Sequence, residues 1–209
     1  MKILNLIPIM VLSLLVISRC TEKKSPDAGS NMVSTMTAAP EKPDFHGYES
    51  EATWGHHLVT VGGCNDCHTP KKMGSHGPEF DSTLMLSGHP AGMPKIDVDR
   101  KAMEKKGLVI TQHLTEWIGP WGVSYAANLT PDPSGIGDWT IENLMLALRE
   151  GKAKGLAASR TLLPPMPWNE VTRFYTDDEI KAMFAYLKTV KPVSNNVPAP
   201  LPPASAGKM

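Results

Sequence analysis

Cysteine is scarce in this chain, whose 209 residues include three: Cys20, Cys64 and Cys67. A zinc site needs a second ligand pair, and the sequence has no other cysteine-containing motif that would supply one. The βαβ pattern that normally surrounds a thioredoxin-like Cys-x-x-Cys pair is also missing. Zinc binding and thiol redox catalysis are therefore disfavoured, while a structural disulfide between Cys64 and Cys67 stays open at this point.

Charge excess and regular β patterning are lacking as well. The formal net charge is +0, and no basic stripe or aromatic-basic interleaving suggests nucleic acid as a partner. Alternating β-branched runs are few, while 19 prolines and 17 glycines indicate much loop. The composition predicts a mainly α domain with long irregular connections and terminal extensions.

A long hydrophobic run is also absent, apart from a short one at the amino terminus. Lys2 precedes an apolar stretch from Ile3 to Ile17 that is short for a membrane span and suited to an export signal. Residues 1–19 are predicted to be a signal peptide of the lipoprotein type, with Cys20 as the lipid-bearing residue. An ordinary signal peptide cut nearby and an uncleaved anchor remain alternatives. Each places the mature protein outside the cytoplasm, in the periplasm or at the cell surface.

The rest of the chain divides into three segments by composition. Residues 20–45 are rich in Ser, Thr, Pro, Ala and charged residues without periodicity, which predicts a flexible tether. Residues 46–193 contain all the periodic segments and are predicted to be one domain. Residues 194–209 form a Pro/Ala-rich tail that cannot hold a helix.

The strongest motif is Cys64-Asn65-Asp66-Cys67-His68. This CxxCH spacing is typical of covalent haem attachment, in which each thiol adds to one porphyrin vinyl group. The short turn between the thiols then presents His68 to the iron as the proximal ligand. Because the motif occurs once, one covalently bound haem c is expected.

Met166 is the predicted distal ligand of the iron. Prolines on both sides deny its segment a helix and stiffen it in an extended form, which would hold the thioether at a fixed point. Imidazole with thioether is the usual electron-transfer pair. Rival ligands lie in residues 70–118, which we expect to form a long loop walling off the haem edge; they are Met73, Met85, Met93, His76 and His89. Within this loop we expect a short charged helix from Asp97 to Gly107 and a short strand from Val109 to Leu114.

Two helices are expected at the ends of the domain. The first runs from about Tyr48 to Val61 and contains Gly55, whose small size would permit close crossing of a partner such as Tyr186. The last starts at a capping box formed by Thr176 and Glu179 and carries an apolar stripe. A third helix is expected to open at Thr140 and end at Gly151, with Arg149 complementing the helix dipole or pairing with a haem propionate.

These features together resemble a class I c-type cytochrome, and more narrowly the monohaem domains in the cytochrome subunits of membrane-bound alcohol and aldehyde dehydrogenases. The matching segments are residues 64–70, 127–132, 135–140, 147–151, 165–168 and 185–187. The resemblance implies a small α-helical fold around one haem c held by Cys64 and Cys67, with His68 and Met166 axial. Those subunits typically carry several such domains, whereas this chain has one, so no particular dehydrogenase partner is implied.

The expected function is electron transfer by a monohaem cytochrome, with redox proteins as donor and acceptor and the membrane contacted through a lipid anchor. No enzymatic activity is expected, because two protein ligands leave the iron no open position. A haem-based gas sensor or peroxidase-type enzyme with a labile distal ligand is the first alternative. A cytochrome subunit of a dehydrogenase or respiratory complex is the second.

Overall fold

The structure is a computed structural model that describes residues 44–206. The signal peptide, Cys20 and nearly all of the predicted tether lie outside the described residues. Within residues 44–206, no helix is both long enough and apolar enough to cross a membrane. The α-helices there are α1 (Glu51–Val61), α2 (Cys64–His68), α3 (Arg100–Lys105), α4 (Ile141–Glu150) and α5 (Asp177–Leu187), with three 3₁₀ turns, η1 (Ser82–Leu84), η2 (Ala153–Gly155) and η3 (Thr172–Phe174).

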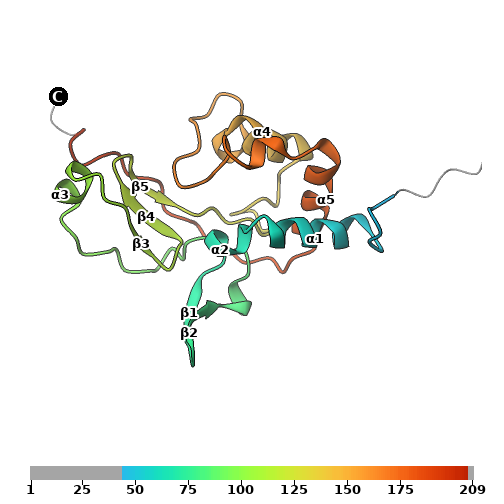
Figure 1. Cartoon of the computed structure of the whole chain (residues 1–209), viewed down its shortest axis with the longest axis horizontal. Coiled ribbons are helices and arrows are strands. Elements are labelled where there is room, and N and C mark those ends of the chain that lie inside the picture. The colour runs from blue at the N-terminus through green and yellow to red at the C-terminus, as the bar shows by residue number, and fades with distance from the viewer. Residues whose placement is uncertain (1–43, 207–209) are drawn as a thin grey trace, which may run out of the picture. The chain divides into compact units, whose positions relative to one another are not determined.

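The expectation of a mainly α fold is wrong, because the described residues also contain two antiparallel sheets. The strands are β1 (Lys71–Gly74), β2 (Gly77–Phe80), β3 (Ile110–Gln112), β4 (Glu116–Gly119) and β5 (Gly122–Tyr125). A hairpin joins β1 to β2, and a separate sheet has the order β3-β4-β5. Residues 70–118 are therefore no irregular loop, since they hold most of these strands together with η1 and α3 (Figure 1).

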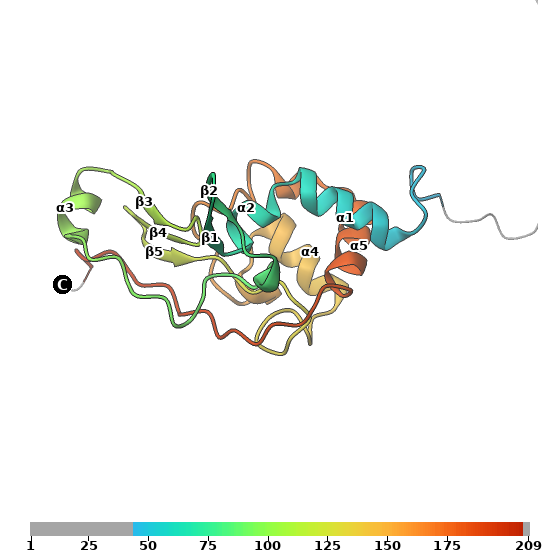
Figure 2. The same cartoon turned by 90° about the horizontal axis from the view of Figure 1, so that it is seen from below.

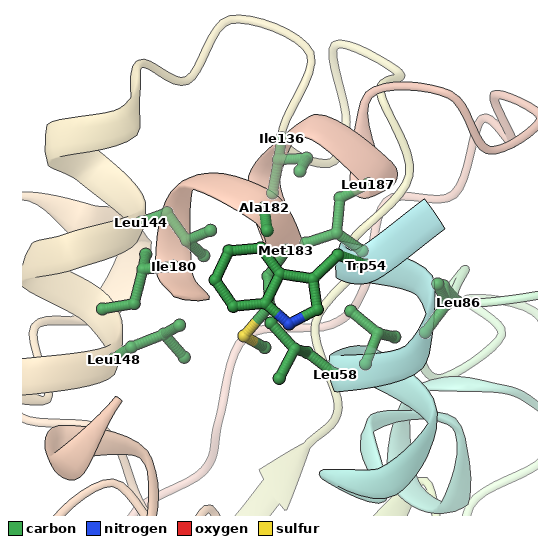
Figure 3. Close-up of a cluster of buried hydrophobic side chains, with 11 residues drawn as sticks. Trp54, Leu58, Leu86, Ile136, Leu144, Leu148, Ile180, Ala182, Met183 and Leu187 are labelled. Atoms are coloured by element: carbon green, nitrogen blue, oxygen red, sulfur yellow. The ribbon is translucent and has the colours of Figure 1, made fainter. Parts of the chain in front are cut away.

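The helical core forms where α1 crosses α5. A methyl group added at Gly55 would lie 1.8 Å from the carbonyl oxygen of Ala182, so only glycine allows the two backbones this close. The close crossing predicted at Gly55 is thus confirmed, although its partner is the α5 backbone rather than Tyr186. Figure 3 shows Trp54 and Leu58 of α1 packed among apolar side chains of α4 and α5.

The helix starts predicted at Thr140 and Thr176 are observed, whereas α1 begins at Glu51 rather than near Tyr48. The Thr176 hydroxyl accepts a hydrogen bond from the Glu179 amide (3.2 Å), and the Glu179 carboxylate accepts one from the Thr176 amide (2.7 Å). Thr140 and Asn143 form an equivalent capping box on α4, which ends at Gly151 with a φ of +63°. These caps satisfy backbone groups that a helix terminus leaves unpaired, and they fix where α4 and α5 begin.

The carboxyl-terminal tail lies against the three-stranded sheet. Within its described part, residues 194–206, there is no helix, as predicted. The tail runs from α5 back past β5 toward α3 (Figure 2). Leu201 exchanges two backbone hydrogen bonds with Val123 of β5, and the Asn195 amide nitrogen donates to the carbonyls of Ser87 and His89. The sheet is therefore tied to the helical core through the tail as well as through its own chain connections.

Candidate haem-attachment site

The CxxCH residues form the single helical turn α2. Gly63 precedes it in a left-handed conformation (φ +68°) that glycine adopts without strain, which lets the chain turn sharply after α1. Residues three and four apart share one face of a helix, so Cys67 and His68 both lie on the face of Cys64. Buried Thr69 fixes the end of the turn by donating to the Asn65 side chain (2.8 Å).

His68 is oriented by a backbone carbonyl far along the chain. Its Nδ1 lies 2.7 Å from the carbonyl oxygen of Ala127. Because a carbonyl can only accept, Nδ1 must carry the proton and donate it, which leaves the Nε2 lone pair free for a metal. Burial lowers the pKa of His68, against the opposing effect of this hydrogen bond. The imidazole is therefore neutral at pH 7, which is the form that binds iron.

Both thiols of the motif are half-buried and neither is in a disulfide. Burial raises the pKa of Cys64 to about 11. It also raises the pKa of Cys67, although the ammonium of Lys71 opposes this. Reactive thiol pairs depend on at least one cysteine with a lowered pKa. These two cysteines lack that property, so the site does not have the electrostatics of a thioredoxin-like centre.

Met166 lies on an irregular segment between α4 and α5. The side chain is half-buried and packs against the same hydrophobic core that Cys64 contacts. A pocket of about 380 Å³ adjoins it and is lined by Leu162, Pro164–Asn169 and Glu170. The ring of Trp168 rests against Gly151, where a methyl group would meet it at 2.3 Å. The segment is thus anchored at the carboxyl end of α4.

Among the rival ligands, Met73 and His89 are placed unfavourably. Met73 is 79% exposed on the β1–β2 hairpin. His89 is buried beside Tyr125 at the end of β5, and its Nδ1 lies 3.0 Å from the Thr115 hydroxyl. Within the described residues, no cluster of three or more His, Cys, Asp or Glu side chains has an arrangement that holds a metal ion.

Sequence reasoning missed several contacts at this site. Tyr175 lies so close to Gly62 that a methyl group there would be 2.5 Å from the phenol oxygen. Burial raises the pKa of Tyr175, and the neighbouring Cys64 adds to this. Arg149 donates to the Tyr175 carbonyl (3.0 Å) and pairs with the Asp177 carboxylate, so it joins α4 to the start of α5. No spacing in the sequence marks these contacts, and the Ala127 carbonyl has no side-chain signal at all.

Comparison with known proteins identifies relatives by sequence, although no family model matches the chain. The chain is 45% identical over 83 residues to the cytochrome c subunit of an alcohol dehydrogenase (quinone) from Gluconobacter oxydans, a match covering 39% of this chain and 16% of that protein. It is 29% identical over 177 residues to the fructose dehydrogenase cytochrome subunit of Gluconobacter japonicus, covering 83% of this chain and 27% of that protein. The resemblance to dehydrogenase cytochrome c subunits is confirmed.

A third relative extends the same pattern. The gluconate 2-dehydrogenase cytochrome c subunit of Pantoea cypripedii is 36% identical over 89 residues, a match covering 39% of this chain and 19% of that protein. The chain spans well under a third of the length of each of these three relatives. The similarity therefore concerns one part of larger proteins.

Proposed function

We propose that this chain is a monohaem c-type cytochrome that transfers single electrons between redox proteins. The observation that carries the proposal is the His68–Ala127 hydrogen bond, which leaves Nε2 as the available nitrogen beside two free thiols. The relatives, all cytochrome subunits of dehydrogenases, support the same reading.

The donor set suits haem c. Cys64 and Cys67 would each add S–H across one vinyl group, forming two thioethers with no leaving group. Haem supplies an iron that cycles between the ferrous and ferric states. His68 would bind the iron through its Nε2, and Met166 would offer its thioether as the second ligand. The His68 imidazole and the Met166 thioether are both uncharged, so neither would add charge beside the iron.

The proposed partner rests on the relatives, and the proposed location rests on the amino-terminal sequence. A dehydrogenase is the proposed electron donor, because the relatives serve such enzymes. The protein acts outside the cytoplasm, tethered through a lipid on Cys20. Replacing Cys20 by alanine should release the haem protein from the membrane fraction, whereas retention there would point to an uncleaved anchor or a bound partner.

Acid-acetone extraction tests covalent attachment. Non-covalent haem leaves a protein under these conditions, but thioether-linked haem stays on the polypeptide. Haem should remain on the wild-type chain, and a Cys64→Ala, Cys67→Ala variant should yield no stably haem-bearing protein. Free extraction of haem from the wild-type chain would contradict the proposal.

The alternative of a gas sensor or peroxidase-type enzyme requires a labile distal ligand. Half-exposure of Met166 and the pocket beside it are the features that would favour that alternative. Ligand access to the iron, rather than attachment of the haem, distinguishes the two functions. A subunit of a larger complex would instead be recognised by its co-purification with an oxidoreductase.

A further inference from the structure

The strand β5 contacts the segment that carries Met166. Ser124 is 6% exposed, and its hydroxyl donates a 2.5 Å hydrogen bond to the carbonyl oxygen of Pro164. The same hydroxyl accepts from the indole Nε1 of Trp121 at 3.1 Å. Two neighbours thereby fix the direction in which the Ser124 proton points, and that direction is toward the Met166 segment.

The same stretch of chain also contacts His68, three residues further on. The Ala127 carbonyl accepts from His68 Nδ1 at 2.7 Å. Gly88 packs directly on this point, since a methyl group there would lie 2.5 Å from the Ala127 carbonyl carbon. The flanking bonds from the His89 amide to the Ala126 carbonyl (2.9 Å) and from the Leu129 amide to the Leu86 carbonyl (2.8 Å) hold Ala127 in place.

We propose that residues 124–127 are a brace that sets the positions of both axial ligands, with Ser124 as the positioning residue for Met166. The inference rests on the proposed function, because it assumes that His68 and Met166 ligate one iron. It gives the three-stranded sheet a role at the proposed iron site.

Proline chemistry explains why the distal side needs such a brace. Pro164, Pro165 and Pro167 have no backbone N–H, so the segment has few donors with which to bind the rest of the molecule. Its attachment therefore depends on its carbonyl oxygens and on packing. The Pro164 carbonyl is exposed to competition from water once its partner is removed, which would let Met166 move away from the iron more often.

The test compares Ser124→Ala with the wild-type full-length haem protein. Carbon monoxide binds ferrous iron only after the methionine has left, so its binding rate reports the methionine-off population. Loss of one hydrogen bond should raise that rate by about two- to tenfold. The near-infrared sulfur-to-iron band of the ferric protein should weaken in parallel. Ser124→Thr keeps the hydroxyl and should restore both values toward wild type.

Two further variants make the result specific. Trp121→Phe removes the donor that orients Ser124, so the carbon monoxide binding rate should rise, but by less than in Ser124→Ala. Thr111→Val removes a hydroxyl-to-carbonyl bond (2.8 Å, to Glu116) in the same sheet without touching the Pro164 contact, and should leave the rate unchanged.

If Ser124→Ala and Trp121→Phe both bind carbon monoxide at the wild-type rate, the inference is overturned. It is also overturned if Thr111→Val raises the rate as much as Ser124→Ala does, because that result would show a general loosening of the sheet. Failure of the proposed function looks different. In that case the wild-type protein itself lacks the sulfur-to-iron band and binds carbon monoxide at once, which removes the basis of the brace as well.

Discussion

Substitution of Met166 tests whether its thioether is the distal ligand of the iron. Thioether sulfur favours ferrous iron relative to a second imidazole, because soft sulfur suits the electron-rich state. Met166→His should therefore keep the iron six-coordinate while lowering the midpoint potential by on the order of 0.1–0.3 V, within the range that axial ligands span. Redox titration followed by absorbance measures this shift.

The matched control for that experiment is Met73→Leu. Met73 is a rival ligand by sequence but is 79% exposed on the β1–β2 hairpin. Its replacement should leave the potential unchanged. If Met73→Leu shifts the midpoint potential and Met166→His does not, the distal ligand is Met73 on the hairpin.

His89 gives the molecule a pH-dependent stability. It is 2% exposed, and burial together with nearby His113 lowers its pKa to about 4. In the unfolded chain its pKa is about 6.5. The unfolded state therefore takes up the proton first as pH falls, so stability is intact above about pH 6.5 and is lost progressively toward pH 4.

This loss amounts to at most about 3 kcal/mol. Urea unfolding at pH 7 and pH 5 should show a smaller drop in His89→Asn than in wild type, since asparagine can still bond to Thr115 but does not titrate. Equal drops in the two proteins would show that His89 titrates freely in the folded state. The other ionisable groups are common to both proteins and cancel in the comparison.

At the scale of elements, the α1–α5 crossing depends on one missing methyl group. Alanine has the better intrinsic helix propensity by about 1 kcal/mol, but at position 55 its methyl would lie 1.8 Å from the Ala182 oxygen. The obstacle is backbone and cannot rotate away, so the helices must separate. Gly55→Ala should destabilise the protein by about 1–3 kcal/mol or more in chemical denaturation.

Gly92→Ala is the control for this substitution, because nothing lies within 4 Å of a methyl group at that position. It should leave the denaturation midpoint nearly unchanged. An unchanged midpoint in Gly55→Ala as well would mean that the two helices are not in close contact in solution.

The helices could be predicted from sequence because their signals are local. Thr176 with Glu179 and Thr140 with Gly151 mark helix ends through short-range hydrogen bonds and backbone geometry. The strand β3 also falls within a predicted strand from Val109 to Leu114. Caps and periodicity are properties of a few consecutive residues, so no distant partner has to be known.

The other strands could not be predicted, for physical reasons that differ between the sheets. All four residues of β4, Glu116–Gly119, are buried, so the strand shows no alternation between polar and apolar residues. The β1–β2 hairpin is mostly exposed and contains Lys, Gly and Pro, which are poor strand markers. The hydrogen bond between the His68 side chain and the Ala127 carbonyl joins residues 59 positions apart, so no local sequence pattern records it.

On the scale of the whole molecule, the tail joins parts of the chain that are distant in sequence. Ending the chain at Ser194 removes the two Leu201–Val123 hydrogen bonds and the two bonds that the Asn195 side-chain nitrogen donates. At about 1 kcal/mol each, their loss should destabilise the sheet by about 2–4 kcal/mol. Hydrogen exchange of the Val123 amide should accelerate accordingly.

A chain ending at Ala206 keeps all of these contacts and is the control for the truncation. It should exchange like the full-length protein. If the Ser194 truncation also exchanges at the full-length rate, the tail does not hold the sheet in solution.

Carbon monoxide added to the reduced wild-type protein reports whether the iron has an open position, because an electron carrier with two protein ligands keeps its iron closed. We expect no rapid binding by the wild-type protein and immediate binding by Met166→Ala, in which the distal position would be open. Immediate binding by the wild-type protein would show that the iron is not closed by two protein ligands and would favour a gas sensor or peroxidase-type enzyme.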